Sequence, residues 1–215
     1  MRRKPNLIPR IERCAHLLEN SPQELRGSWL DMYAVFSELR VELGCGKGRF
    51  TCDMAAREPR VLFAAIEKVP DALVVAMERA EERGLGNLRF IARDAAEIGE
   101  FFAPGEVSRI YINFPDPWPK KKQYKRRLTA PGFQKLCWEA LAPAGEIHFK
   151  TDNADLFEWS LEQYERCGWT LREVTRDLHA DAPECVMTDY EAKFREQGVK
   201  INRLVAVKGE SFSCG

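Results

Sequence analysis

A short loop of unusual composition carries the clearest chemistry in this chain. Residues 113–120 read Asn-Phe-Pro-Asp-Pro-Trp-Pro-Lys, so that one acid, Asp116, stands between two prolines that fix the backbone dihedral φ. Six basic side chains lie within residues 120–127. Lysine and arginine neutralise phosphates, and the basic run is contiguous with a rigid segment. We therefore expect a polyanion to bind here, in preference to an ordinary solvated loop.

A glycine-rich loop follows the first predicted strand. Residues 42–48 read Glu-Leu-Gly-Cys-Gly-Lys-Gly, and glycines at this spacing allow a tight turn and close approach of a ligand to the backbone. A dinucleotide-binding loop would place its third glycine one residue later. The acid Glu42 would repel a phosphate but attract an amino group. The loop therefore favours an amino-acid-bearing nucleoside over a dinucleotide, although an ordinary strand–helix turn would look similar.

Acids or amides also end the neighbouring predicted strands. Glu67 ends the second strand, where a carboxylate can accept two hydrogen bonds from a ribose diol. Asp94 ends the third strand and suits an adenine amino group. Asn113 ends the fourth, with Asp116 close behind. Because ligands of open α/β sheets bind outside the carboxyl ends of the strands, we expect these side chains and Glu42 to surround a nucleotide-like ligand.

Strands and helices alternate along the chain from about residue 38. Short apolar runs that end in glycine or an acid predict strands, and amphipathic segments predict helices. The expected strands are residues 39–43, 61–66, 88–92, 109–113, 147–150, 169–174 and 201–207. The expected helices are residues 49–57, 70–83, 131–141 and 154–167. This alternation predicts an α/β fold with a mostly parallel seven-stranded sheet and helices on both faces.

Length and composition fit one large domain. The chain has 215 residues, of which 45% are hydrophobic and 31% charged, as is ordinary for a globular protein. We expect a basic N-terminal arm with a short helix over residues 1–37, loose over residues 1–20, and a single domain over residues 38–215. The formal net charge of +0 hides an asymmetry, since positive charge gathers at residues 2–4 and 120–127. The arm either contacts RNA or has no role.

Cysteine and histidine are scattered. The seven cysteines are widely spaced and form no Cys-x-x-Cys pair, and the three histidines are equally scattered. This spacing argues against a zinc site and against a disulfide framework. Free thiols fit a reducing cytosol. Neither a signal-peptide core nor a membrane-spanning run is visible. We therefore expect a cytoplasmic protein without a metal and without a membrane partner.

Together these features resemble the Rossmann-like class of S-adenosylmethionine-dependent methyltransferases. Four segments narrow the resemblance, namely residues 113–120, Arg126-Arg127-Leu128, residues 149–153 (Phe-Lys-Thr-Asp-Asn) and residues 188–194 (Thr-Asp-Tyr-Glu-Ala-Lys-Phe). In this order they are similar to the tRNA (guanine-N7)-methyltransferase family, over about residues 42–207. The 113–120 motif is highly specific, whereas the glycine loop is not. The resemblance implies methyl transfer from S-adenosylmethionine to N7 of guanine 46 in the variable loop of tRNA.

The family pattern also implies roles for individual residues. Asp116 matches the catalytic position. The cofactor-binding positions, including the loop glycines, are Glu42, Gly44, Gly46, Gly48, Glu67, Asp94 and Asp116. The substrate-contacting positions are Lys120, Asp152, Thr188, Asp189, Tyr190 and Glu191. The segment expected to touch RNA comprises Lys122, Gln123, Tyr124, Lys125, Arg126 and Arg127.

Three details stay open at this stage. Family members often carry histidine near positions 123 and 124, where this chain has glutamine and tyrosine, and tyrosine can stack on a base. Phe114 and Trp118 can either stack on the target base or pack the loop against the domain. The segment Thr188-x-x-Glu191 has the form of a capping box, so it predicts a helix start that can also face the substrate.

Guanine N7 is a lone-pair nucleophile, so its methylation requires no general base. The main requirement is placement of N7 in line with the methyl carbon and the sulfur. A nearby carboxylate favours the positive charge that the purine gains. We therefore expect Asp116 to orient the guanine and to stabilise charge, not to remove a proton.

Other functions fit parts of the sequence. The first alternative is a methyltransferase that acts on another RNA or DNA base or on a small molecule. Residues 113–116 favour it because they resemble the Asn/Asp-Pro-Pro-aromatic motif of amino-methylating enzymes. A non-catalytic RNA-binding module is another, although the acids and glycines argue against lost activity. An NAD-dependent oxidoreductase is disfavoured by the glycine spacing and by Glu42. The sequence indicates no obligate protein partner and leaves monomer and homodimer open.

Overall fold

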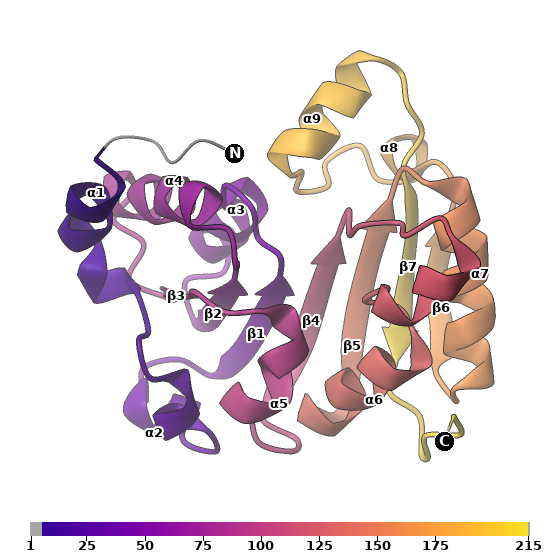
Figure 1. Cartoon of the computed structure of the whole chain (residues 1–215), viewed down its shortest axis with the longest axis horizontal. Helices are drawn as coiled ribbons and strands as arrows, with labels where there is room; N and C mark the ends of the chain where they lie inside the picture. The colour runs from indigo at the N-terminus through magenta and orange to yellow at the C-terminus, as the bar shows by residue number, and fades with distance from the viewer. Residues whose placement is uncertain (1–5, 215) are drawn as a thin grey trace.

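A seven-stranded sheet forms the centre of residues 6–214, the part of the chain that the computed structural model describes (Figure 1). The strands lie in the order β3-β2-β1-β4-β5-β7-β6. Strand β7 pairs antiparallel with both of its neighbours, and the other pairs are parallel. The bounds are β1 Glu38–Leu43, β2 Val61–Ile66, β3 Leu88–Ile91, β4 Val107–Asn113, β5 Leu141–Thr151, β6 Thr170–Thr175 and β7 Asn202–Val207. The expected mostly parallel sheet is confirmed.

Helices cover both faces of the sheet (Figure 1). The apolar side chains of α3 and α4 pack in one buried cluster, and those of α2, α5, α6 and α7 pack in another. Strand β2 supplies both clusters by alternation, with Leu62 facing the second and Phe63 the first. The helices are α1 Leu7–Arg13, α2 Trp29–Met32, α3 Arg49–Arg57, α4 Pro70–Glu82, α5 Ile98–Phe101, α6 Pro131–Ala140, α7 Ala154–Arg166, α8 Leu178–Asp181 and α9 Asp189–Glu196.

The strand order creates a switch point between β1 and β4. From β1 the chain moves outward through β2 and β3, and it then returns to add β4 on the other side of β1. The loops after β1 and β4 therefore diverge, and a crevice opens at the carboxyl ends of these two strands. The sequence placed the glycine loop and the 113–120 motif at these ends.

Strand β5 is longer than the sequence indicated. A strand was expected over residues 147–150, yet β5 begins at Leu141, which pairs with Val107. The register then shifts before Glu146 pairs with Arg109. Residues 142–145 form this irregularity, and Ala144 adopts a left-handed backbone with φ of 57°. Gly145 looked like the end of a helix because a bulge and a loop use the same residue types.

The N-terminal segment is tied to the domain from residue 7 onward. The guanidinium of Arg10 in α1 bonds Glu78 of α4, with Nε to Oε1 at 2.8 Å. Trp29 of α2 is fully buried, and its indole nitrogen donates to the carbonyl oxygen of Phe101 at 2.9 Å. The expected loose arm is therefore packed over residues 7–20, whereas residues 2–4 lie outside the described residues. The division at residues 37 and 38 stays a prediction.

Two cysteines form a disulfide that the sequence did not suggest. Cys167, at the end of α7, is bonded to Cys214 near the C-terminus. Cys14, Cys45 and Cys52 are buried free thiols, as is Cys137. The expectation of free thiols throughout is thus wrong for one pair. None of the helices in residues 6–214 is long and apolar enough to cross a membrane.

Candidate active site

A cavity of about 540 Å³ opens at the carboxyl ends of β1, β4 and β5. This is the switch point of the sheet, where a ligand of an α/β protein is expected. Its volume lies within the range of small-molecule sites. The lining residues come from four segments, and they include Glu42, Gly44, Cys45, Gly46, Lys47, Arg49, Phe50, Asn113, Phe114, Pro115, Asp116, Pro117, Thr151, Asp152, Asn153, Thr188, Asp189, Tyr190 and Lys193.

The three glycines of the first loop have different roles. Gly44 and Gly46 line the cavity with left-handed backbones, and a side chain added to either would meet no atom within 4 Å. Gly48 precedes α3 instead, and an added Cβ there would lie 2.6 Å from Cβ of Ala76 in α4. Gly44 and Gly46 therefore leave room for a ligand, whereas Gly48 lets α3 and α4 pack closely.

Glu42 forms a buried acidic wall of the cavity. Its side chain is at the end of β1, and the residue is only 1% exposed. Oε1 accepts a hydrogen bond of 2.8 Å from Nδ2 of Asn113, and Oε2 accepts one from the hydroxyl of Thr51. Burial raises the pKa of Glu42 to about 6, against the lowering effect of these two hydrogen bonds. At neutral pH the carboxylate is mostly ionised and can attract a ligand amino group.

Glu67 and Asp94 lie at the expected strand ends but are absent from the cavity lining. Glu67 accepts hydrogen bonds from the backbone nitrogens of Gly46 (2.9 Å) and Val69 (2.8 Å). Asp94 caps a short 3₁₀ helix by accepting from the nitrogen of Ala96 at 3.0 Å. This bond, helped by the ammonium of Lys68, lowers the pKa of Asp94. Both carboxylates thus accept hydrogen bonds from backbone nitrogens, and their contacts with a ligand stay predictions.

The 113–120 loop is held in an unusual backbone shape. Phe114 and Trp118 both have positive φ, of 51° and 42°. The backbone nitrogen of Phe114 donates to the carbonyl oxygen of Lys150 at 2.9 Å, which fixes the start of the loop. Between these two points Asp116 is exposed and lines the cavity. Left-handed backbone is costly for aromatic residues, and it persists here because the neighbouring contacts determine it.

Arg127 differs from the rest of the basic run. It is 3% exposed, and its guanidinium donates to the carbonyl oxygens of Pro117 (2.9 Å) and Trp118 (3.3 Å). The same group lies over the rings of Tyr124 (3.7 Å) and Trp159 (4.4 Å). The predicted RNA contact of Arg127 is therefore not supported. Its buried side chain instead stabilises the 113–120 loop through these carbonyl oxygens.

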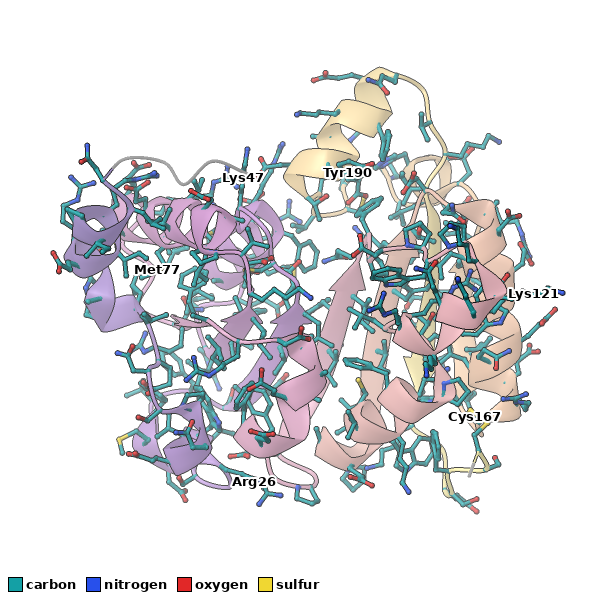
Figure 2. The ribbon with its side chains drawn as sticks, viewed as in Figure 1. Arg26, Lys47, Met77, Lys121, Cys167 and Tyr190 are labelled. Atoms are coloured by element: carbon teal, nitrogen blue, oxygen red, sulfur yellow. A yellow bond between two sulfur atoms is a disulfide. The ribbon has the colours of Figure 1, made fainter. Side chains whose placement is uncertain are left out.

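The other basic residues of the run face solvent. They lie on or next to a 3₁₀ helix over Lys121–Arg126. Lys120, Lys121, Lys122, Lys125 and Arg126 are exposed. Figure 2 labels Lys121 at the edge of the molecule, with its side chain directed outward. Arg126 covers the ring of Trp118 at 4.7 Å, so Trp118 packs within the loop, as one of the two interpretations expected.

The segment at residues 188–191 forms the predicted capping box at the start of α9. Oγ1 of Thr188 accepts from the nitrogen of Glu191 at 2.9 Å, and Oε2 of Glu191 accepts from the nitrogen of Thr188 at 3.3 Å. Thr188, Asp189 and Tyr190 line the cavity together with Asp152. Glu191 is fully buried, and Lys120 and Glu191 are not part of the lining. The predicted substrate contact of Glu191 is thus not supported, because its carboxylate faces the protein interior.

Sequence reasoning missed several lining residues, among them Lys47, Arg49 and Lys193. Lys193 could have been found, because it lies one helical turn after Asp189 and so shares a face of α9 with it. Lys47 stands within the glycine loop that the sequence had already placed at the site.

Phe114 packs edge-on against Tyr190, with ring centres 5.6 Å apart.

His179, Cys185 and Glu191 bring three possible metal ligands within 4.8 Å of one another. The ammonium of Lys150 lies 3.2 Å from Oε2 of Glu191 and neutralises the carboxylate that a cation would use. Burial also raises the pKa of Cys185, which keeps the thiol protonated. We interpret the group as a hydrogen-bonded cluster beneath α9.

Comparison with known proteins gives a family and a fold. A family model described as "Putative methyltransferase" matches residues 37–204. The solved structure of the 16S rRNA methyltransferase KamB aligns with a TM-score of 0.66 at 12% identity, over 86% of this chain and 94% of that chain. A 16S rRNA (adenine(1408)-N(1))-methyltransferase from Catenulisporales acidiphilia aligns with a TM-score of 0.60 at 13% identity, over 90% and 95%. A mutant of the latter, solved with its cosubstrate SAM, aligns with a TM-score of 0.59 at 13% identity, over 88% of this chain and 92% of that chain.

Proposed function

This chain belongs to the family described as putative methyltransferase, and we propose that it transfers a methyl group from S-adenosylmethionine to N7 of a guanine in tRNA. The target is guanine 46 of the variable loop. The observation that carries the proposal is that one cavity joins the glycine loop after β1 to the 113–120 motif after β4. A cofactor and a target base need such a shared space.

The cofactor side of the site is built from β1 and its neighbours. We assign Glu42 to the ammonium group of the cofactor, and Gly44 and Gly46 to the close backbone approach that their open surroundings allow. Glu67 is assigned to the ribose and Asp94 to the adenine. A carboxylate oxygen that accepts one backbone hydrogen bond can still accept another.

When bound, S-adenosylmethionine supplies an electrophilic methyl group. The chain's own residues then orient the acceptor, because N7 of guanine already carries a lone pair. Asp116 is exposed at the cavity and can accept hydrogen bonds from guanine N1–H and N2–H. Its charge also favours the positive charge that the purine gains. We assign Asp152 and Tyr190, which line the same cavity, to further substrate contacts.

The RNA backbone contacts the exposed cations beyond this loop. Lys120, Lys122, Lys125 and Arg126 offer positive charge next to the cavity, and phosphate contacts of this kind position an RNA without reading its sequence. A guanine buried in folded tRNA must leave its stack to reach Asp116.

The test is methylation of an unmodified tRNA transcript with labelled S-adenosylmethionine, followed by nucleoside analysis. We expect 7-methylguanosine, and we expect none when guanine 46 of the transcript is replaced by adenine. A fragment of 16S rRNA serves as a matched RNA control and should stay unmodified.

Each contrary outcome has a separate meaning. A methylated base other than guanine N7 would keep the reaction class but overturn the substrate. Binding of tRNA without binding of S-adenosylmethionine in calorimetry would favour a non-catalytic RNA-binding module. Methylation of the rRNA fragment alone would overturn tRNA as the partner.

A further inference from the structure

A long insertion between two adjacent strands forms one wall of the cavity. Strands β6 and β7 pair antiparallel, and a turn of two residues can join such neighbours. Here residues 176–201 intervene and carry α8 and α9. Four lining residues belong to this insertion, namely Thr188, Asp189, Tyr190 and Lys193. Long connections in compact domains are usually functional, and this one, which we call the cap, covers the site.

Apolar burial contributes little to the position of α9. Within this helix Glu191 is the only buried residue, and Tyr190 is 53% exposed. Figure 1 shows α9 projecting beyond the ends of the strands. A helix that buries so little apolar surface has low local stability on its own. Beside the aromatic contacts of Tyr190 and Phe194 with Phe114, polar contacts therefore help to set where α9 lies.

The first such contact anchors the cap to β5. Nζ of Lys150 lies 3.2 Å and 3.3 Å from the two carboxylate oxygens of Glu191, and it donates to the carbonyl oxygen of Val186 at 2.8 Å. Both side chains of this ion pair are buried. Removal of one partner would leave a buried, unpaired charge, so this contact does not open readily.

The second contact reaches the cap from the other side of the cavity. Arg79 of α4 binds Asp189 with two hydrogen bonds, NH1 to Oδ2 at 2.9 Å and NH2 to Oδ1 at 3.3 Å. Helix α4 follows β2, on the opposite side of β1 from the cap (Figure 1). The two side chains are 28% and 37% exposed, so the pair is partly hydrated and breaks more easily than the buried one.

Charge explains why the second contact matters. Asp116, Asp152 and Asp189 all line the same cavity, and like charges in a shared site repel. Arg79 neutralises Asp189 and so allows α9 to stay close to the other two acids. We expect loss of this pair to release the start of α9, which carries Tyr190, from α4. Figure 2 shows Tyr190 and Lys47 on facing sides of the opening.

We propose that Lys150 and Arg79 are positioning residues, with Lys150 anchoring the cap to β5 and Arg79 latching it over the cavity. The family pattern gives neither residue a role. The inference deepens the proposed function and rests on it for the identity of the substrate that Thr188 and Tyr190 contact. The geometry of the cap itself does not depend on that identity.

The test compares Arg79→Met with Arg83→Met. Arg83 is the C-cap residue of α4, one turn after Arg79, and it pairs with Asp53 of α3 instead of the cap. Its side chain is 35% exposed, against 28% for Arg79. We expect Arg79→Met to speed hydrogen exchange of residues 186–197 about 3- to 10-fold and to raise KM for tRNA by a similar factor. The kcat at saturating tRNA should change less than twofold, and Arg79→Lys should restore part of the loss. Arg83→Met should leave both readouts unchanged.

A companion pair of variants tests the anchor. Lys150→Met alone should expose the cap to exchange, because Glu191 is then buried without a partner. Adding Glu191→Gln should restore protection, since the unpaired charge is gone. Equal exchange in the single and double variants would overturn the anchor role.

Two results would overturn the latch. One is unchanged exchange of residues 186–197 in Arg79→Met, and the other is faster exchange with unchanged KM. Hydrogen exchange is measured without tRNA, so it tests the latch even if the protein methylates a different substrate. Failure of tRNA methylation in the unmodified protein would instead count against the proposed function.

Discussion

Asn113 donates a hydrogen bond of 2.8 Å from Nδ2 to Oε1 of Glu42, and this contact joins the carboxyl ends of β4 and β1. The bond spans the switch point of the sheet, where the two strand-end loops diverge. It fixes the orientation of a buried carboxylate in the wall of the cavity. The amide of Asn113 thus prepares Glu42 for a ligand, while the loop beyond it carries Asp116.

Cofactor binding should weaken in acid because Glu42 titrates. Its pKa is raised to about 6 by burial, so the carboxylate that attracts an ammonium group is lost as the pH falls through that value. Calorimetry with S-adenosylhomocysteine from pH 5 to 8 should give a Kd that rises below pH 6, approaching tenfold per pH unit. Glu42→Gln should bind weakly with a flat profile over the same range. The same acid dependence in Glu42→Gln would show that another group titrates.

Gly48→Ala should destabilise the fold more than replacement of a glycine that has positive φ but open space around it. The added Cβ would meet Ala76 at 2.6 Å, and φ is +74°. Left-handed backbone costs roughly 1–2 kcal/mol, and overpacking adds roughly 1–3 kcal/mol. Urea denaturation should therefore give a loss of about 2–5 kcal/mol.

Gly84→Ala is the matched control for this clash. Its φ is +62°, yet an added Cβ meets nothing within 4 Å, so only the backbone cost applies. The double change Gly48→Ala with Ala76→Gly should recover part of the loss. Equal losses at both glycines would mean that contact between α3 and α4 is not what requires Gly48.

The sheet and the outline of the site follow from local sequence patterns. A strand that ends in glycine or an acid is visible from a few residues, which is why Glu42, Asn113 and Asp116 could be placed before the fold was known. The capping box at Thr188 is also local and is confirmed. Strand order brings these segments together, and topology rules limit that order.

The side-chain partners of buried charges could not be predicted in this way. Arg127 looked like its basic neighbours, but Trp159 and Tyr124 enclose it, and Trp159 lies far along the chain. Glu191 faces Lys150 of a different strand. The bond between Cys167 and Cys214 joins residues 47 apart that no local spacing connects. Burial of a charge depends on tertiary contacts that charge patterning does not record.

Asp116→Asn should lower kcat with little change in KM for tRNA. The amide keeps the size and part of the hydrogen bonding of the carboxylate, but it lacks the charge that favours an alkylated purine. Loss of one preorganised electrostatic contact typically lowers kcat by about 10²–10³-fold. Asp155→Asn, an exposed acid of α7 outside the cavity lining, is the control and should retain activity. Near-full turnover of Asp116→Asn would exclude a charge role.

The basic run should separate into residues that bind RNA and one that holds the loop. Lys122, Lys125 and Arg126 are exposed, so their joint replacement by alanine should reduce the dependence of log Kd on log salt. The slope should fall by roughly 2–3 if each contacts one phosphate. Filter binding between 50 and 300 mM salt measures this, and the melting temperature should not change. An unchanged slope would place the RNA elsewhere.

Arg127→Met should behave in the opposite way. The side chain keeps its stem against Tyr124 and Trp159 but no longer donates to the carbonyl oxygens of Pro117 and Trp118. Carbonyl groups that lose a charged donor cost about 1–3 kcal/mol, so the free energy of unfolding should fall by that amount. Turnover should fall too, because the backbone that presents Asp116 loses its support, whereas the salt slope should match that of the unmodified protein. A slope reduced by about 1 with unchanged stability would instead return Arg127 to the RNA interface.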